Sequence, residues 1–192
     1  MSTSKKNGTS QAGFTLVEIA IVMVIIGLLI GGVLKGQSMI REAKVKRVVK
    51  TADELRAAIM TFYDKYGMYP GDENKPNIPP GDTHEGNGSG QTTYDERFAF
   101  YEDLAKAKLV SGSFNGTSDL LKHPFGGNVE VYWSNPSGAG YGHYIFFRNL
   151  PWDVCLEIDT KYDDGVYNTG SIRASSAYSN ATSAISWLAM PL

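Results

Sequence analysis

The feature that most constrains this chain is a continuous apolar run near its N-terminus. From Phe14 to Leu34 the sequence reads FTLVEIAIVMVIIGLLIGGVL, which is 21 residues with one ionisable side chain, Glu18. About 20 apolar residues in a helix span the hydrocarbon core of a bilayer. The run is longer than the apolar region of a cleaved secretory signal, and no A-x-A site closes it. Few soluble domains can cover a helix that is apolar on every side. We therefore expect Phe14–Leu34 to lie in a membrane.

The helical pattern continues beyond this run to about Gly67. Charged residues occupy most faces of the continuation, and Gly67 and Pro70 supply a stop signal. Its apolar residues recur every three or four positions and form one stripe: Val45, Val48, Val49, Ala52, Leu55, Ile59, Phe62 and Tyr66. We predict one long helix from Phe14 to about Gly67. Residues 14–34 form its membrane half, and residues 35–67 form an amphipathic continuation that packs on a domain.

Residues 68–192 are predicted to form that domain, which is rich in loops. Tyr69–Gln91 is a long loop of Gly, Pro, Asn and Asp. A second helix is expected around Asp95–Leu109, and its apolar face carries Phe98, Tyr101, Leu104, Ala105 and Leu109. Strands are expected at Val129–Trp133, Tyr144–Arg148 and Asp153–Ile158, with a hairpin turn between Asn149 and Trp152. The predicted fold is therefore α+β: a long N-terminal helix packed on a small, mainly antiparallel sheet.

Composition and motifs exclude several classes of function. The formal net charge of −2 gives no reason to expect nucleic-acid binding. There is no G-x-S-x-G turn, phosphate-binding loop or pair of catalytic carboxylates. The histidines, His84, His123 and His143, have no metal-ligand spacing. Cys155 is the one cysteine, and its place in a predicted strand favours a packed thiol over a nucleophile. We predict that the protein is not an enzyme.

A short motif opens the apolar run. Residues 1–13 are polar, carry two lysines and are expected to be disordered. They are followed by Gly13-Phe14-Thr15-Leu16-Val17-Glu18. In this context the G-F-T-L-V-E segment closely resembles the start of the type IV prepilin family, which includes pilus subunits, type II secretion pseudopilins and competence pilins. The resemblance implies that residues 1–13 are a leader peptide. It also implies that a prepilin peptidase cuts between Gly13 and Phe14, and that the new amine of Phe14 is methylated.

The motif gives Glu18 a function. A carboxylate in hydrocarbon costs several kcal/mol unless a partner neutralises it. Cleavage would create such a partner, the cationic amine of Phe14 on a neighbouring subunit, at nearly the same depth. Without the motif, a charge that reaches the membrane surface would be the simpler interpretation of Glu18. With it, we expect Glu18 to favour assembly and to set the register between subunits.

The resemblance implies a location and a set of partners. Related or identical pilin subunits, the peptidase, inner-membrane lipid and the platform of a pilus or type II secretion system would be the partners. The chain would cross the bacterial inner membrane once, with its C-terminal domain in the periplasm, before entering a filament. A simple count of basic residues gives the opposite orientation, because more of them follow the apolar run than precede it. We follow the family, because those residues belong to a folded helix.

Two functions follow from these observations. The first is a structural subunit of a type IV pilus-like or type II secretion pseudopilus filament, assembled through the N-terminal helix. The alternative is a membrane-anchored periplasmic ligand- or metal-binding module that does not polymerise. Leader processing separates the two, because a plain anchor would keep residues 1–13 or be cut elsewhere.

Two acidic segments are candidates for metal binding. The spacing from Glu85 to Glu96 fits an EF-hand-like calcium loop, although Glu replaces Asp at the first position. Its candidate ligands are Glu85, Asn87, Ser89, Gln91 and Glu96. The alternative interpretation is a flexible Gly-rich loop. The segment Asp159–Gly165 is the second candidate, and its Asp-Gly dipeptide is more typical of a turn. No cofactor other than calcium is expected.

Overall fold

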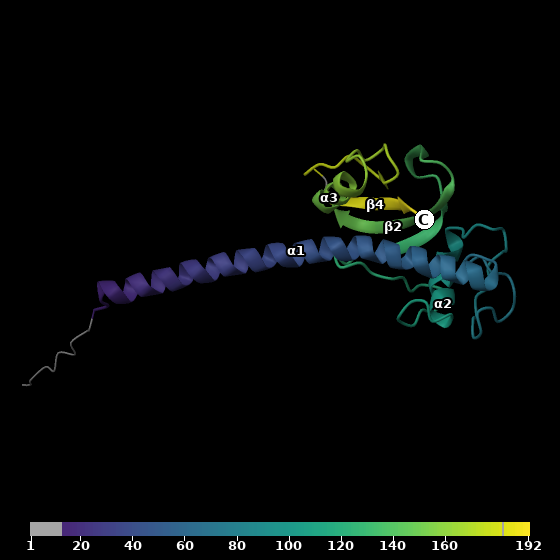
Figure 1. Ribbon diagram of the computed structural model, residues 1–192, viewed down its shortest axis with the longest axis horizontal. Coiled ribbons are helices and arrows are strands. Elements are labelled where there is room, and N and C mark those ends of the chain that lie inside the picture. The colour runs from purple at the N-terminus through teal and green to yellow at the C-terminus, as the bar shows by residue number, and fades with distance from the viewer. Residues whose placement is uncertain (1–12, 182) are drawn as a thin grey trace, which may run out of the picture. The chain divides into compact units, whose positions relative to one another are not determined.

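The computed structural model describes residues 13–181 and 183–192. Apart from Gly13, the predicted leader therefore lies outside the described residues. The chain divides into two compact units, of which one ends at Glu42 and the other comprises Ala43–Leu192. Helix α1, Leu16–Tyr66, contributes residues to both units (Figure 1). The predicted long helix is confirmed. No helix break occurs at the four glycines of its first half, because helical geometry is continuous from Leu16 onwards.

The second unit contains a four-stranded antiparallel sheet with the order β1-β2-β4-β3. Its strands are β1 (Val129–Ser134), β2 (Gly142–Pro151), β3 (Arg173–Ala174) and β4 (Ala184–Pro191). Figure 1 shows β2 and β4 side by side, and they pair from Tyr144 opposite Pro191 to Pro151 opposite Ala184. The strands predicted at 129–133 and 144–148 are confirmed as parts of β1 and β2. The α+β fold class is confirmed with them.

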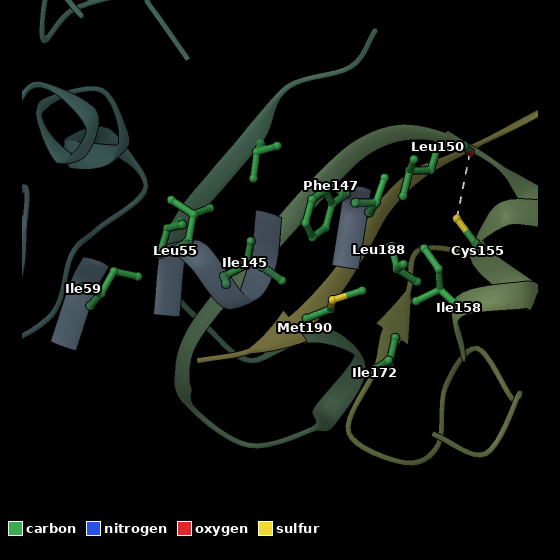
Figure 2. Close-up of a cluster of buried hydrophobic side chains, with 14 of the residues drawn as sticks. Leu55, Ile59, Ile145, Phe147, Leu150, Cys155, Ile158, Ile172, Leu188 and Met190 are labelled. Carbon is green, nitrogen blue, oxygen red and sulfur yellow. Dashed lines mark hydrogen bonds between the residues drawn. The ribbon is translucent and has the colours of Figure 1, made fainter. Parts of the chain in front are cut away.

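The core lies between one face of this sheet and residues 45–62 of α1. Side chains along a strand alternate between the two faces of a sheet, and Ile145 and Phe147 of β2 point to the face that α1 covers. Leu55 and Ile59 of α1 belong to the same cluster (Figure 2). Most of the predicted stripe is buried here, with Val49 and Tyr66 only partly covered. Arg56 also donates to the carbonyl of Pro191, at 3.0 Å from Nε, and so joins α1 to the end of β4.

The second predicted helix is present but shorter than expected. A 3-10 turn, η1 (Asp95–Arg97), precedes α2 (Ala99–Lys106). Tyr101 and Leu104 are buried as predicted, whereas Phe98, Ala105 and Leu109 are only half-buried. The unpredicted buried members of α2 include two carboxylates, Glu102 and Asp103. A second 3-10 turn, η2 (Pro136–Gly138), connects β1 to β2.

The strand and hairpin turn predicted after Asn149 are wrong. β2 continues through this point to Pro151, and residues 153–158 lie in a helix, α3 (Trp152–Tyr162). Its buried side chains are Val154, Cys155, Ile158 and Asp159, which is the i, i+1, i+4, i+5 spacing of a helix and not the alternation of a strand. Cys155 is therefore in a helix. Its predicted packing in the core is confirmed, and its thiol faces the carbonyl of Leu150 at 4.0 Å (Figure 2).

Candidate assembly site

The residues at the start of α1 form a reciprocal helix cap. Thr15 precedes the first helical residue, Leu16, and its Oγ1 accepts a hydrogen bond from the backbone N–H of Glu18 at 3.2 Å. The Glu18 carboxylate reaches back, and its Oε2 accepts from the Thr15 N–H and the Thr15 hydroxyl, both at 2.8 Å. This is the capping box, in which a Thr and a Glu three residues later satisfy free donors of the first turn. T-x-x-E is the usual sequence signature of this cap, and Thr15 and Glu18 match it, so the cap could have been predicted from the sequence.

The predicted cleavage point lies just outside this cap. Gly13 and Phe14 are exposed and have no helical geometry. A side chain at Gly13 would meet no atom within 4 Å. The folded chain therefore does not require glycine at this position, and any requirement for it comes from a processing enzyme.

The first half of α1 presents apolar side chains that none of the described residues covers. Every residue from 14 to 35 is exposed, and this part of α1 is long and apolar enough to cross a membrane. Its large exposed members include Leu16, Ile21, Met23, Leu28, Leu29 and Val33. Such a surface needs lipid or other apolar helices around it.

These features coincide with a known sequence family. Residues 8–34 match the family model of the prokaryotic N-terminal methylation motif, which is the hallmark of type IV prepilin-like proteins. The chain carries a type IV prepilin-like N-terminus. Comparison with curated proteins and with solved structures yielded no significant match. The prepilin-like motif covers the cap and the exposed apolar run, so residues 35–192 must be interpreted from their own geometry.

The candidate calcium loop of this prepilin-like chain is closed by hydrogen bonds of its own. Glu96 accepts from the backbone N–H of Asn87 at 2.9 Å and from that of Thr93 at 2.7 Å. Ser89 instead donates its backbone N–H to Asp72 at 2.8 Å, and Asp72 lies outside the EF-hand spacing. Glu85 and Gln91 are exposed. The structure brings Asn87 to Glu96 and directs Ser89 elsewhere, and calcium binding by this loop stays a prediction.

The second acidic segment forms a turn after α3. Asp159, Asp163 and Asp164 each offer a carboxylate oxygen within 4.8 Å of the others. All three accept hydrogen bonds from backbone N–H groups of the following residues, at 3.3 Å, 2.6 Å and 2.9 Å respectively. Asp159 also accepts the Tyr178 hydroxyl at 2.6 Å. The hydrogen bonds to these carboxylates therefore shape the turn, which agrees with the turn interpretation of Asp-Gly.

The three histidines lie at separate places and each has a partner. His84 Nδ1 is 2.6 Å from a carboxylate oxygen of Glu102 on α2, and His123 Nε2 is 2.7 Å from the carbonyl of Arg148. His143 Nε2 accepts from the backbone N–H of Thr92 at 3.0 Å. Burial lowers the pKa of His143 to about 4, so this nitrogen is free of a proton at neutral pH and can accept. These contacts hold loops in place.

Proposed function

We propose that this chain is a structural subunit of a filament of the type IV pilus or type II secretion pseudopilus class, with no catalytic role of its own. The observation that carries this proposal is the coincidence of the methylation motif with a helix whose first half is fully exposed. An apolar helix of this length inserts in the inner membrane and later packs against the same helix of other subunits. Residues 43–192 would remain in the periplasm and form the outer part of the filament.

Leader removal would change the chemistry at the start of α1. Hydrolysis of the peptide bond between Gly13 and Phe14 produces a carboxylate on Gly13 and a cationic amine on Phe14. That amine sits one residue before the Thr15–Glu18 cap. A carboxylate in an apolar environment needs a partner that neutralises it. In a staggered packing of helices, the amine of one subunit can neutralise Glu18 of the next. Assembly would then depend on cleavage.

The basic residues that follow the apolar run are compatible with a periplasmic domain. Arg47 pairs with Glu54 at 2.9 Å, Lys50 reaches the same carboxylate at 3.5 Å, and Arg56 pairs with Asp53 at 2.8 Å. These charges are part of a folded helix surface. The positive-inside rule applies to short flanking loops and has less weight for residues of a folded domain.

The mature N-terminus tests the proposal. Protein from cells that contain the prepilin peptidase should lack residues 1–13, start at Phe14 and carry one additional methyl group in an intact-mass measurement. Gly13→Val should leave the full-length chain, because the fold tolerates a side chain here and only the peptidase step is affected. The mature chain should also enter the sheared filament fraction.

A protein that still starts at Met1 in peptidase-positive cells would contradict the proposal. That result would favour the alternative, a membrane-anchored periplasmic ligand- or metal-binding module that does not polymerise.

A further inference from the structure

Three carboxylates that are distant in sequence meet beside α2. Glu73 and Asp82 come from the loop between α1 and α2, and Asp103 comes from α2 itself. One carboxylate oxygen of each lies within 4.8 Å of the other two. Glu73 and Asp103 are completely buried, and Asp82 is half-buried. Carboxylates are rarely buried together, because each charge disfavours the other two.

Each of these carboxylates is held by a backbone N–H through one oxygen only. Gly71 donates to Asp103 Oδ2 at 2.6 Å, Lys75 to Glu73 Oε2 at 3.1 Å, and His84 to Asp82 Oδ1 at 3.3 Å. The second oxygens, Asp103 Oδ1, Glu73 Oε1 and Asp82 Oδ2, are buried and have no hydrogen-bond partner among the described residues. A buried polar atom without a partner is uncommon and costly. Here each of the three clustered carboxylates carries one such atom.

No cation of the described chain neutralises the cluster. Within residues 13–181 and 183–192, none of the three carboxylates takes part in an ion pair. Burial, together with the neighbouring charges, raises the pKa of Glu73 to about 7 and that of Asp103 to about 9. An isolated cluster of this kind would have to take up protons or an external cation.

The loop backbone is built to approach α2 at this point. Gly71 has a φ of +78°, and a Cβ there would lie 2.8 Å from the carbonyl oxygen of Glu96 and 2.9 Å from the backbone nitrogen of Phe100. Only glycine permits this approach, which brings the Gly71 N–H to Asp103. A Cβ at Gly86 would be 2.2 Å from the Gly71 carbonyl oxygen, so the loop also folds tightly on itself.

We propose that Glu73, Asp82 and Asp103 bind a calcium ion that fastens the loop between α1 and α2 onto α2. Carboxylate oxygens are the ligands that calcium prefers, at about 2.3–2.6 Å, so two ligands of one ion are at most about 5 Å apart. The cluster satisfies this limit. Magnesium needs near-ideal octahedral geometry and gives up its water reluctantly. Ligands from a long loop and a short helix suit the more tolerant calcium ion, and water completes its coordination.

This site is separate from the candidate loop Glu85–Glu96. Its ligands are 9 and 21 positions apart in the sequence, so no local spacing could indicate it. Glu96 and Asp72, which close the candidate loop, accept hydrogen bonds with both of their oxygens. The three carboxylates of the new site each leave one oxygen open. Calcium here is also independent of the filament proposal, because it can be measured on the isolated chain.

The experiment measures calcium binding by the full chain in detergent. The protein is stripped with a chelator, dialysed and titrated with calcium chloride in a calorimeter, and its thermal unfolding is followed by tryptophan fluorescence. We expect one calcium ion per chain. A ligand at 100-fold excess over its Kd should raise the melting temperature by about 5–10 °C for a chain of this size. The same concentration of magnesium should give a much smaller shift.

Two isosteric variants locate the site. Asp103→Asn and Glu73→Gln keep volume and an acceptor for the Gly71 or Lys75 N–H, and each removes one charge. Loss of an outer-shell partner lowers metal affinity 10–100-fold, so loss of a ligand charge should lower it by about 100-fold or more. Without calcium, Asp103→Asn should melt at or above the wild-type temperature, because asparagine is neutral without having to take up a proton when it is buried. If the Asp103 carboxylate served only to stabilise the fold, Asp103→Asn would instead melt below the wild-type temperature.

Glu96→Gln is the matched control and should bind calcium as the wild type does. Absence of calcium binding by the wild type would overturn the site. So would unchanged binding by Asp103→Asn and Glu73→Gln, or loss of binding in Glu96→Gln alone, which would place calcium in the Glu85–Glu96 loop. An equal response to magnesium would overturn the choice of calcium.

Discussion

Glu18 takes part in two arrangements that use different atoms. In the single chain it caps its own helix through Oε2, which binds both donors of Thr15. In the proposed filament the Phe14 amine of another subunit approaches the same carboxylate, and Oε1 faces no competition from the cap. The two roles are therefore compatible, and substitutions can separate them. Glutamine preserves a capping box but carries no charge.

We predict that Glu18→Ala and Glu18→Gln both fail in assembly. Each loses the charge that neutralises the buried amine, and an unpaired buried charge costs several kcal/mol. Insertion in the membrane should be at least as efficient as before, because a costly carboxylate is gone, and leader cleavage should persist. The measurement is the amount of the variant chain in sheared filaments relative to membrane-bound monomer.

Thr15→Ala is the control for that prediction. It removes the hydroxyl of the cap, at a cost of about 1 kcal/mol, and keeps the charge of Glu18. Its incorporation should stay close to that of the wild type. Normal incorporation of Glu18→Gln would show that charge pairing does not drive assembly of this protein.

His143 makes the stability of the second unit depend on pH. Its ring packs against Tyr69, with centroids 4.2 Å apart, and against Trp133 at 5.1 Å. Burial lowers its pKa from 6.5 to about 4, and the nearby charge of Asp72 opposes part of that shift. Between these pH values the unfolded chain binds a proton that the folded chain does not. The free energy of unfolding therefore falls as pH falls from 6.5 to 4.

We predict that protonation of His143 lowers the free energy of unfolding by about 2 kcal/mol over this pH range, a value that allows for partial solvent access to the ring. His143→Gln can still accept from the Thr92 N–H but does not titrate. Denaturant unfolding of both proteins at pH 7 and pH 4 measures the effect as the loss of wild-type stability relative to the variant. Other titrating groups act equally in the two proteins. A constant difference across this range would contradict the assignment.

At the scale of elements, the length of a pattern decided how well it could be predicted. The stripe along α1 repeats over about six turns, and its helical period is unmistakable. Residues 153–158 comprise less than two turns. Val154, Leu156 and Ile158 fit the alternation of a strand, and Val154, Cys155 and Ile158 fit the spacing of a helix equally well. The structure buries Cys155 and leaves Leu156 half-exposed, which is the helical solution. Packing on the sheet selected between two patterns that the sequence leaves almost equal.

The last two strands, β3 and β4, were harder still to predict. β3 has two residues, and β4 ends in a proline, which is disfavoured inside strands. β4 exists because it pairs with β2 along seven positions and covers the core with Leu188 and Met190. Those pairings are long-range and have no local signature.

Sites formed by residues close together in the sequence were also easier to predict than sites formed by distant residues. The cleavage motif and the cap are local in sequence, and the cap could have been read directly from Thr15 and Glu18. The cluster of Glu73, Asp82 and Asp103 depends on how a loop folds back on α2, which no pattern in the sequence records.

At the scale of the whole molecule, α1 contributes to two units. In the first unit its apolar side chains are exposed, and in the second most of them are buried. Within the first unit, residues 14–34 are exposed and almost entirely apolar. From Ala43 onwards, α1 contributes the stripe that completes the core of the second unit. Burying a large apolar side chain is worth about 1.5–3 kcal/mol. The stripe therefore stabilises the second unit without help from the first.

We predict that a fragment starting at Arg41 is a folded, soluble monomer. It keeps Val45, Leu55 and Phe62 of the core and omits the exposed apolar run. Size-exclusion chromatography with light scattering should give the monomer mass, and circular dichroism should show cooperative thermal unfolding. An aggregated or unfolded fragment would mean that neighbouring subunits are needed for this part of α1 to fold.

Cys155 is the one thiol in 192 residues, and its environment has a practical consequence. It is completely buried, and burial raises the pKa of its thiol well above the usual value. The thiolate is the species that reacts with maleimides and disulfide-forming reagents, so Cys155 does not react with either reagent while the chain is folded. A second cysteine placed on an exposed position of α1 would be the sole reactive thiol. Distances between subunits of the proposed filament can therefore be mapped by cross-linking in the natural sequence background, with no need to remove Cys155 and risk a cavity in the core.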